Sequence, residues 1–384
     1  MKLDRHTQGI PYWRLSGFYF FYFASLGAIL PYWSLYLKSI GFNATSIGQL
    51  TAILIGTKII APNIWGWIAD HHGHRMQIIR YASLVAALAF TGVLFTVSFF
   101  WLAMVLVVFG FFWNASLPQF EATTLTHLGD SFHAYTRIRV WGSVGFITSV
   151  WALGGVFAHY DIALLPAIIL GIMFLILLVS LTVPEQAAGH LPLEHNSLTR
   201  VLKRPEVIAL LLVCFLMQAS HAPYYTFYSL YLEEHGYSRT FIGEMWAIGV
   251  IAEVVVFLFM HRLILHVRLK TLLLLSLAAA IVRWYMISYF IDSAILLTIA
   301  QLFHAATFGV YHATAIQLIH RYFTGRLQGR GQALYSSVSF GAGLSLGSLI
   351  SGYVWEGLGP LACYQGAMLV SLLTFCITWR WIKT

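Results

Sequence analysis

The sequence predicts an all-α membrane protein whose twelve transmembrane helices form two pseudo-symmetric bundles of six. Three observations lead to this prediction: an apolar composition, a series of separate apolar segments, and an internal repeat. Of the 384 residues, 59% are hydrophobic and only 9% are charged, and the mean hydropathy is +0.77. Soluble globular domains carry about 25% charged residues, so this composition indicates a chain surrounded by lipid.

Twelve apolar segments are each long enough to cross a bilayer, which takes about 20 residues. Charged or glycine-rich breaks separate them, and they leave no room for a separate soluble domain. The first segment is too long for the core of a signal peptide, so we interpret it as a retained helix. The segments lie near residues 12–37, 45–69, 77–99, 101–126, 138–158, 162–183, 206–232, 240–262, 270–290, 294–320, 331–354 and 360–381.

The lysines and arginines predict the orientation of these helices. If the N-terminus is cytoplasmic, 18 of the 22 lie on or near the inside, because only Lys38 and Arg239 fall outside and only Lys58 and Arg283 fall within the membrane. Membrane proteins concentrate Lys and Arg in their cytoplasmic loops. We therefore expect both termini in the cytoplasm, and we interpret the net charge of +8 as topology rather than as nucleic-acid binding.

An internal repeat divides the chain. Residues 32–48 (YWSLYLKSIGFNATSIG) align with residues 227–243 (FYSLYLEEHGYSRTFIG) at an offset of 195. Hydrophobicity alone does not explain why glycines and a serine recur at the same places. The positions concerned are Ser34/Ser229, Gly41/Gly236 and Gly48/Gly243. We infer two parallel halves, 1–183 and 206–384, joined by a proline-containing cytoplasmic linker at 184–205.

The stretch GWIADHHGHR lies between the second and third segments. It resembles the loop signature G-x-x-x-D-R-x-G-R-R of major facilitator transporters, with Gly66, Asp70, Gly73 and Arg75 at matching positions. Glycine permits a close helix approach and a tight turn, and we expect Asp70 to bind a neighbouring helix end or a cation in one gating state. The three histidines of this stretch also raise metal binding, but their spacing without a carboxylate is poor chelating geometry, so we expect no metal.

Five charged residues in the predicted helices stand out as candidates, because an ionised side chain near the bilayer centre costs roughly 2.5–3.5 kcal/mol. They are Lys58, Glu121, Arg139, Glu253 and Arg283. Lys58 and Glu253 are separated by the repeat offset of 195, so we expect them to face each other near the midplane. We also expect Arg283 to pair with Glu253, and Glu121 with Arg139. The alternative for each pair is a purely structural role, because buried ion pairs also lock helices together.

Two histidines in the tenth segment suggest proton chemistry. Thr307 shares a face with His304, whereas in an α-helix His312 is turned from that face by about 80°. Histidine titrates near neutral pH, so we expect Glu253, His304 and His312 to couple transport to a proton. The alternative is a hydrogen bond between helices, which is a common role for a membrane histidine.

Three further residues are candidate substrate contacts. His221 and Tyr225 share a face of the seventh segment, and Tyr22 lies in the first segment beside small residues. Most other aromatic residues are expected to face lipid or to serve packing.

Several strings with polar residues in membrane positions are similar to the phenylpropionate permease branch of the major facilitator superfamily, a relative of the lactose permease and nucleoside–proton symporter groups. These strings are LPYWSLYLKSIGF (30–42), RIRVWGSVGF (137–146), QASHAPYYTFYSLYLEEHGYS (218–238), AEVVVF (252–257), VRWYM (282–286) and QLFHAATFGVYHATA (301–315). The resemblance implies the major facilitator fold. It also implies a charged set that Glu121, Arg139, Glu253, Arg283 and either His304 or His312 match. The lactose-type plan has an acidic residue one turn below its helix-ten histidine, and this sequence has none there.

We therefore expect proton-coupled symport of a small organic substrate by alternating access in a bacterial inner membrane. The resemblance points to an aromatic carboxylate such as a phenylpropionate. Protonation of Glu253 or a histidine would free Arg283 to hold the carboxylate in a bidentate contact. The other expected substrate contacts are Glu121, Arg139, Lys58, His221, Tyr225 and Tyr22. We expect the substrate, protons and the lipid bilayer as partners, no cofactor, no nucleic acid, and a monomer.

Two other transport functions remain open. A sugar or nucleoside symporter would use Glu121 and Arg139 to bind hydroxyl groups, and a drug or metabolite efflux pump would share the fold, which sets neither direction nor cargo. We do not expect a membrane enzyme such as an acyltransferase. No Ser/His/Asp or H-x-x-x-x-D arrangement lies at a membrane face, and no cofactor motif occurs.

Overall fold

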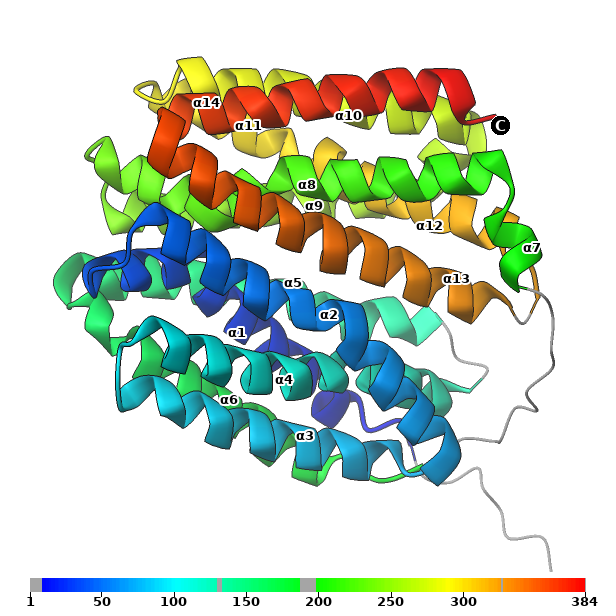
Figure 1. Cartoon of the computed structure of the whole chain (residues 1–384). Helices are drawn as coiled ribbons and strands as arrows, with labels where there is room; N and C mark the ends of the chain where they lie inside the picture. Colours follow the sequence, from blue (N-terminus) through cyan, green and yellow to red (C-terminus); the bar gives the residue numbers. More distant parts are fainter. Residues whose placement is uncertain (1–8, 130–132, 187–197, 326, 384) are drawn as a thin grey trace, which may run out of the picture.

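The computed structural model describes residues 9–129, 133–186, 198–325 and 327–383, and within these ranges it contains helices and no strand (Figure 1). The longer helices are α1 (Tyr12–Ser39), α2 (Ala44–His72), α3 (Arg75–Phe90), α4 (Phe99–Leu128), α5 (His133–His159), α6 (Leu165–Thr182), α8 (Pro205–Glu234), α9 (Arg239–His266), α10 (Leu269–Tyr289), α11 (Ala294–Leu302), α12 (Tyr311–Tyr322), α13 (Leu327–Ser336) and α14 (Leu344–Trp381). The shorter elements are helix α7 (Leu198–Leu202), the 3₁₀ turns η1 (Thr91–Leu94) and η2 (Ile162–Leu164), and the π-helical segments η3 (Ala305–Val310) and η4 (Ser337–Gly343).

The described residues contain 11 helical segments that are long and apolar enough to cross a membrane. The last segment, Leu327–Trp381, has 55 residues, which is far more than the roughly 20 that one passage needs. Its helix breaks at Gly359, where φ is 87° and ψ is 171°, just before Pro360. Figure 1 shows the red end of α14 running back from this bend. The segment therefore makes two passages, and the predicted twelve-helix, all-α architecture is confirmed.

The repeated sequences form the same turn in both halves. Gly41 and Gly236 have φ values of 96° and 79°, a region that favours glycine. Two residues later, Asn43 Oδ1 accepts a hydrogen bond from the backbone of Ser46 at 2.9 Å. Ser238 Oγ likewise accepts one from the backbone of Phe241 at 3.2 Å. The repeat is thus a turn followed by a capped helix.

A second pair of repeated glycines lies where the halves touch. A Cβ added to Gly48 would lie 2.7 Å from the Cα of Gly352, and one added to Gly243 would lie 3.3 Å from the Cα of Gly154. Helix α2 therefore packs closely on α14, and α9 on α5. Small residues allow such close contact between membrane helices, which explains why both halves keep glycine at this position of the repeat.

Charged groups join the halves at the end of the bundle where α2 and α9 begin, which we call the closed end. The backbone N–H of Ala44 donates to Glu356 Oε2 at 2.8 Å. Arg239 Nη1 donates to the carbonyl of Phe157 at 3.3 Å. An anion thus caps the first turn of α2 and a cation caps the last turn of α5. Both charges have the sign that stabilises the helix end they contact.

Helices pack both within and between the two expected units, with α14 on α2 and α9 on α5 across them. Helix α1 packs on α5 and α6, α4 packs on α2 and α3, and α14 packs on α8 and α10. Figure 1 shows α1–α6 in the lower part and α8–α14 in the upper part. The linker contains a short helix, α7, that the sequence did not lead us to expect.

Part of the topology stays a prediction. Residues 187–197 of the linker and the basic residues Lys2, Arg5 and Arg326 lie outside the described residues. The boundaries 1–183 and 206–384 and the cytoplasmic location of both termini therefore stay predictions.

Replacing Gly48 by leucine should force the closed end apart, because the new side chain meets the α14 backbone. In a variant without native cysteines, cysteines at Gln49 and Tyr353, whose side chains are hydrogen-bonded at 2.8 Å, report this contact by cross-linking. Overpacking costs typically about 1–3 kcal/mol, so we expect roughly tenfold less cross-linking. Gly171→Leu is the control, since its Cβ would meet no atom within 4 Å. Equal cross-linking in both variants would contradict the assigned contact.

Candidate functional site

A fully buried arginine is the centre of a polar cluster in the second half. Arg283, on α10, has no exposed surface. Its Nη1 donates to His304 Nδ1 at 3.0 Å and to Thr307 Oγ1 at 3.1 Å, and its Nη2 donates to Gln301 Oε1 at 3.2 Å. The guanidinium also lies over the Tyr224 ring, 4.2 Å from its centroid. These contacts supply the partners that a charge inside a membrane protein requires.

His304 connects this arginine to a carboxylate. A guanidinium only donates hydrogen bonds, so His304 Nδ1 accepts from Arg283 and the neutral ring carries its proton on Nε2. That nitrogen lies 3.6 Å from Glu253 Oε2 on α9. The structure thus brings Arg283 and Glu253 together with His304, one of the two histidines that the sequence offered for this set. The contacts run from Arg283 through His304 to Glu253, whereas we expected a direct pair between Arg283 and Glu253.

The second histidine of this passage, His312, lies next to the cluster but makes a different bond. Its Nδ1 is 2.8 Å from Tyr335 Oη. Phe308 stacks between the two histidine rings, with interplanar angles of 12° to His304 and 10° to His312. A regular α-helix would turn His312 away by about 80°. The π-helical segment Ala305–Val310 changes this geometry, and π-helical turns are frequent at functional sites.

A second charged pair lies in the first half, as the sequence predicted. Arg139 Nε on α5 is 3.7 Å from Glu121 Oε1 on α4, and their side chains are 31% and 38% exposed. The Arg139 guanidinium also lies over the Phe23 ring, 4.1 Å from its centroid. This pair is looser and more accessible than the cluster around Arg283.

The aromatic and histidine candidates differ in accessibility. His221 is fully buried, and its Nδ1 donates to the carbonyl of Met217 at 2.8 Å. Tyr22 is also buried, with its hydroxyl 3.4 Å from the carbonyl of Trp113. Tyr225 is only partly buried. Of the three, Tyr225 is the most accessible in this structure.

Lys58 differs from the other charged residues within the membrane. It lies in the middle of α2 and is partly exposed. Among the described residues, no hydrogen bond or ion pair involves its ammonium group, and none joins it to Glu253.

The loop between α2 and α3 forms a local network. Arg75 Nη2 lies 2.6 Å from Asp70 Oδ1, and Arg75 Nη1 donates to Gln119 Oε1 at 2.5 Å. Gly73 ends α2 in the left-handed conformation, with φ of 71°, as the expected tight turn requires. At Gly66 an added Cβ would make only an ordinary contact, 3.8 Å from Gln119 Nε2, so the close approach that we expected there is absent.

The sequence analysis missed two members of the cluster around Arg283. Tyr224 and Gln301 are both buried, and Tyr224 Oη donates to Gln301 Oε1 at 2.9 Å. The signal for Gln301 was its position three residues before His304, on the same helical face. Tyr224 gave no such signal, because aromatic residues are common throughout the membrane segments.

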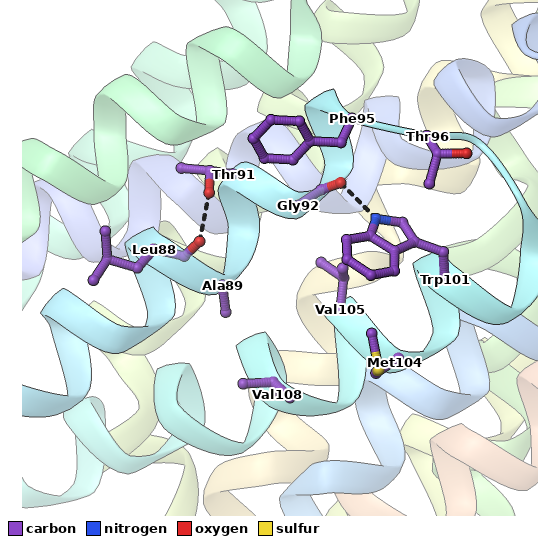
Figure 2. A pocket seen from close by; sticks show the side chains of 10 residues that line it. All are labelled: Leu88, Ala89, Thr91, Gly92, Phe95, Thr96, Trp101, Met104, Val105 and Val108. Atoms are coloured by element: carbon purple, nitrogen blue, oxygen red, sulfur yellow. Dashed lines mark hydrogen bonds between the residues drawn. The ribbon is translucent and has the colours of Figure 1, made fainter.

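A large apolar groove lies elsewhere. A hollow of about 520 Å³ lies between α3, η1 and α4. Figure 2 shows the side chains that line it and the hydrogen bond from Trp101 Nε1 to the carbonyl of Gly92. None of the charged candidates lines it. Its walls are Leu88, Ala89, Thr91, Gly92, Phe95, Thr96, Trp101, Met104, Val105 and Val108. The candidate site is therefore the set of charged residues in the two halves and not this groove.

The chain is similar in sequence and in structure to known membrane transporters. Residues 12–366 match the model of the MFS_1 like family. The chain is 31% identical to a probable 3-phenylpropionic acid transporter of Escherichia coli (strain K12), over 89% of this chain and 90% of that protein. It is 22% identical to the xanthosine permease of the same organism, over 82% and 81% of the two chains. A crystal structure of a point mutant of the nucleoside transporter NupG superposes with a TM-score of 0.87 at 16% identity, covering 96% and 99% of the two chains.

Replacing Arg283 by methionine should destabilise the protein strongly, because it removes one partner from a buried charged cluster. Such changes cost about 3–5 kcal/mol. We expect a clearly lower thermal unfolding midpoint for detergent-purified Arg283→Met, measured with a thiol-reactive dye. Arg268→Met removes an exposed arginine and should leave the midpoint within the range of surface substitutions. Equal midpoints for the two variants would contradict the central position of Arg283.

Proposed function

Because the chain belongs to the MFS_1 like family of membrane transporters, we propose that it carries a small aromatic carboxylate together with a proton. The chain is a transporter and not an enzyme. The observation that carries the proposal is the contact series Arg283–His304–Glu253, a proton-binding group held beside a permanent cation within the membrane. The choice of an aromatic acid such as 3-phenylpropionate is supported by the Escherichia coli relative that is named for this substrate.

Glu253 is the proton carrier in this proposal. Its carboxylate lies 3.6 Å from His304 in the cluster. The position one turn after His304 holds the neutral Thr307, which accepts a hydrogen bond from Arg283 and cannot serve as an acidic proton carrier. Arg283 occupies the lone pair of His304 Nδ1, so a doubly protonated His304 would lose that bond. An incoming proton therefore binds a Glu253 oxygen, and the same proton leaves from Glu253 on the other side of the membrane.

Arg139 links the proton to movement of the halves. In this proposal, the ionised Glu253 attracts Arg139 of the other half because their charges are opposite, and protonation removes that attraction. A proton and a carboxylate that travel together form an electrically neutral load. Neutralising Glu253 therefore loosens the interface while the substrate is bound, which favours alternating access by rocking of the two halves.

We propose the bacterial inner membrane as the location, with both termini in the cytoplasm and the closed end facing outward. The excess of lysine and arginine on one side supports this orientation. In this conformation the site would open toward the cytoplasm. The expected units 1–183 and 206–384 would be the moving bodies, and the contacts at Gly48 and Gly243 would separate when the closed end opens.

A nucleoside or sugar symporter is the second candidate. The observation that favours it is the looseness of the Glu121–Arg139 pair, whose 3.7 Å separation and partial exposure leave both groups free to bind hydroxyl groups. The named substrates of the xanthosine permease and NupG relatives support the same possibility.

Replacing Glu253 by glutamine should separate proton coupling from substrate movement. Glutamine keeps the size of the side chain but binds no proton, so proteoliposomes with Glu253→Gln should still exchange internal for external 3-phenylpropionate. We expect them to lose accumulation driven by a pH gradient, by about tenfold or more.

Glu244→Gln is the matched control, because Glu244 lies on the same helix but is exposed. It should accumulate substrate like the unmodified protein. Normal gradient-driven accumulation by Glu253→Gln would rule out Glu253 as the proton carrier.

A further inference from the structure

Among the five charged candidates in the predicted helices, one cation has no opposite charge beside it. Three cations (Lys58, Arg139 and Arg283) stand against two carboxylates (Glu121 and Glu253). Arg139 contacts Glu121, and Arg283 is connected to Glu253 through His304. Lys58 is left without a partner in the described part of the chain. Charged residues at such depth normally have a partner or a function, so an anion is the missing counterpart of Lys58.

The position of Lys58 on α2 directs it away from lipid. Ile60 and Trp67 are 57% and 63% exposed and mark the outer face of the helix. At 100° per residue they lie about 200° and 180° around the helix from Lys58. On the flanks, Thr57 contacts Asn114 of α4 at 2.8 Å, and Ile59 lies against Gly341 of the second half. Lys58 therefore points between the halves, into the region where a midplane site forms.

An aromatic surface lies beside this position. Ile55, one turn before Lys58, packs with Ala222, Leu344 and the ring of Tyr225. Tyr225 is itself partly exposed. An aromatic ring thus lies one helical turn along α2 from the level of the Lys58 ammonium group.

We propose that Lys58 binds the carboxylate of the substrate, with the aromatic ring of the substrate against Tyr225. This assignment rests on the proposed function and deepens it. Arg283 does not take this role, because both of its terminal nitrogens already donate to protein acceptors and it has no exposed surface. Lys58 has three free N–H donors and a flexible stem, which suit a single carboxylate. The anion that balances the membrane charges is then the substrate itself.

Binding of a charged and a neutral probe to purified protein tests this role. The probes are 3-phenylpropionate and its uncharged amide, 3-phenylpropionamide, measured by isothermal titration calorimetry in detergent. A hydrogen bond to a charged group contributes about 1.5–3 kcal/mol. We therefore expect Lys58→Met to raise the Kd of the acid by about tenfold or more and to leave the Kd of the amide unchanged. Lys58→Arg keeps the charge and should keep most of the preference for the acid.

Lys38→Met is the matched control, because it removes an exposed lysine near the closed end and should change neither Kd. An unchanged preference for the acid in Lys58→Met, or an equal loss of acid and amide binding, would overturn the assignment while leaving the proposed substrate class standing. If the unmodified protein binds neither probe, or binds both equally, the proposed aromatic carboxylate substrate fails first and the role of Lys58 fails with it.

Discussion

The need to compensate charge inside the membrane organises this protein. Arg283 satisfies it with three hydrogen bonds from its terminal nitrogens and the face of Tyr224, so the second half holds a charged cluster whose main contacts are made within the protein. Glu121 and Arg139 satisfy it as a loose pair. Lys58 has no partner among the described residues. Because a charge within the membrane costs roughly 2.5–3.5 kcal/mol, the lack of a partner for Lys58 requires a functional explanation. That explanation divides the proposed work between the halves: the second binds the proton and the first binds the charge of the substrate.

The proposed opening of the interface between the halves has to break the contacts at the closed end. These include glycine packing, as at Gly48 and Gly243, hydrogen bonds to the helix ends, as at Glu356 and Arg239, and the side-chain hydrogen bond between Gln49 and Tyr353. Where glycines pack, the helix backbones come close together but few side chains interlock. A hydrogen bond on a helix end can be exchanged for water at small cost. Because the same sequence repeat produces both sets of contacts, the two sides of the interface can release together.

Much of this architecture follows from the sequence. Apolar length predicted the twelve passages, and the repeat predicted where equivalent turns and glycines would fall. The charged residues within predicted helices and the family resemblance led us to group Glu253 and Arg283 with His304 or His312. Three features did not follow. The order of contacts, from Arg283 through His304 to Glu253, depends on how α10 and the helix that carries His304 are rotated about their axes. The spacing of residues along the sequence does not determine that rotation. The alignment of His304 with His312 depends on a π-helical segment that interrupts the regular period. The isolation of Lys58 is a property of the packed structure, because a pseudo-symmetric partner at Glu253 was available in the sequence but forms its contact with His304 instead.

Proton-coupled movement of an aromatic carboxylate is tested by transport with the purified protein in liposomes that contain a pH-sensitive dye. A pH gradient is imposed, and uptake of labelled 3-phenylpropionate is compared with that of a sugar and a nucleoside. We expect accumulation of the acid that collapses when the gradient is removed, with proton entry beyond the passive leak of the acid. Gradient-driven uptake of the nucleoside or the sugar, with none of the acid, would contradict the proposed function.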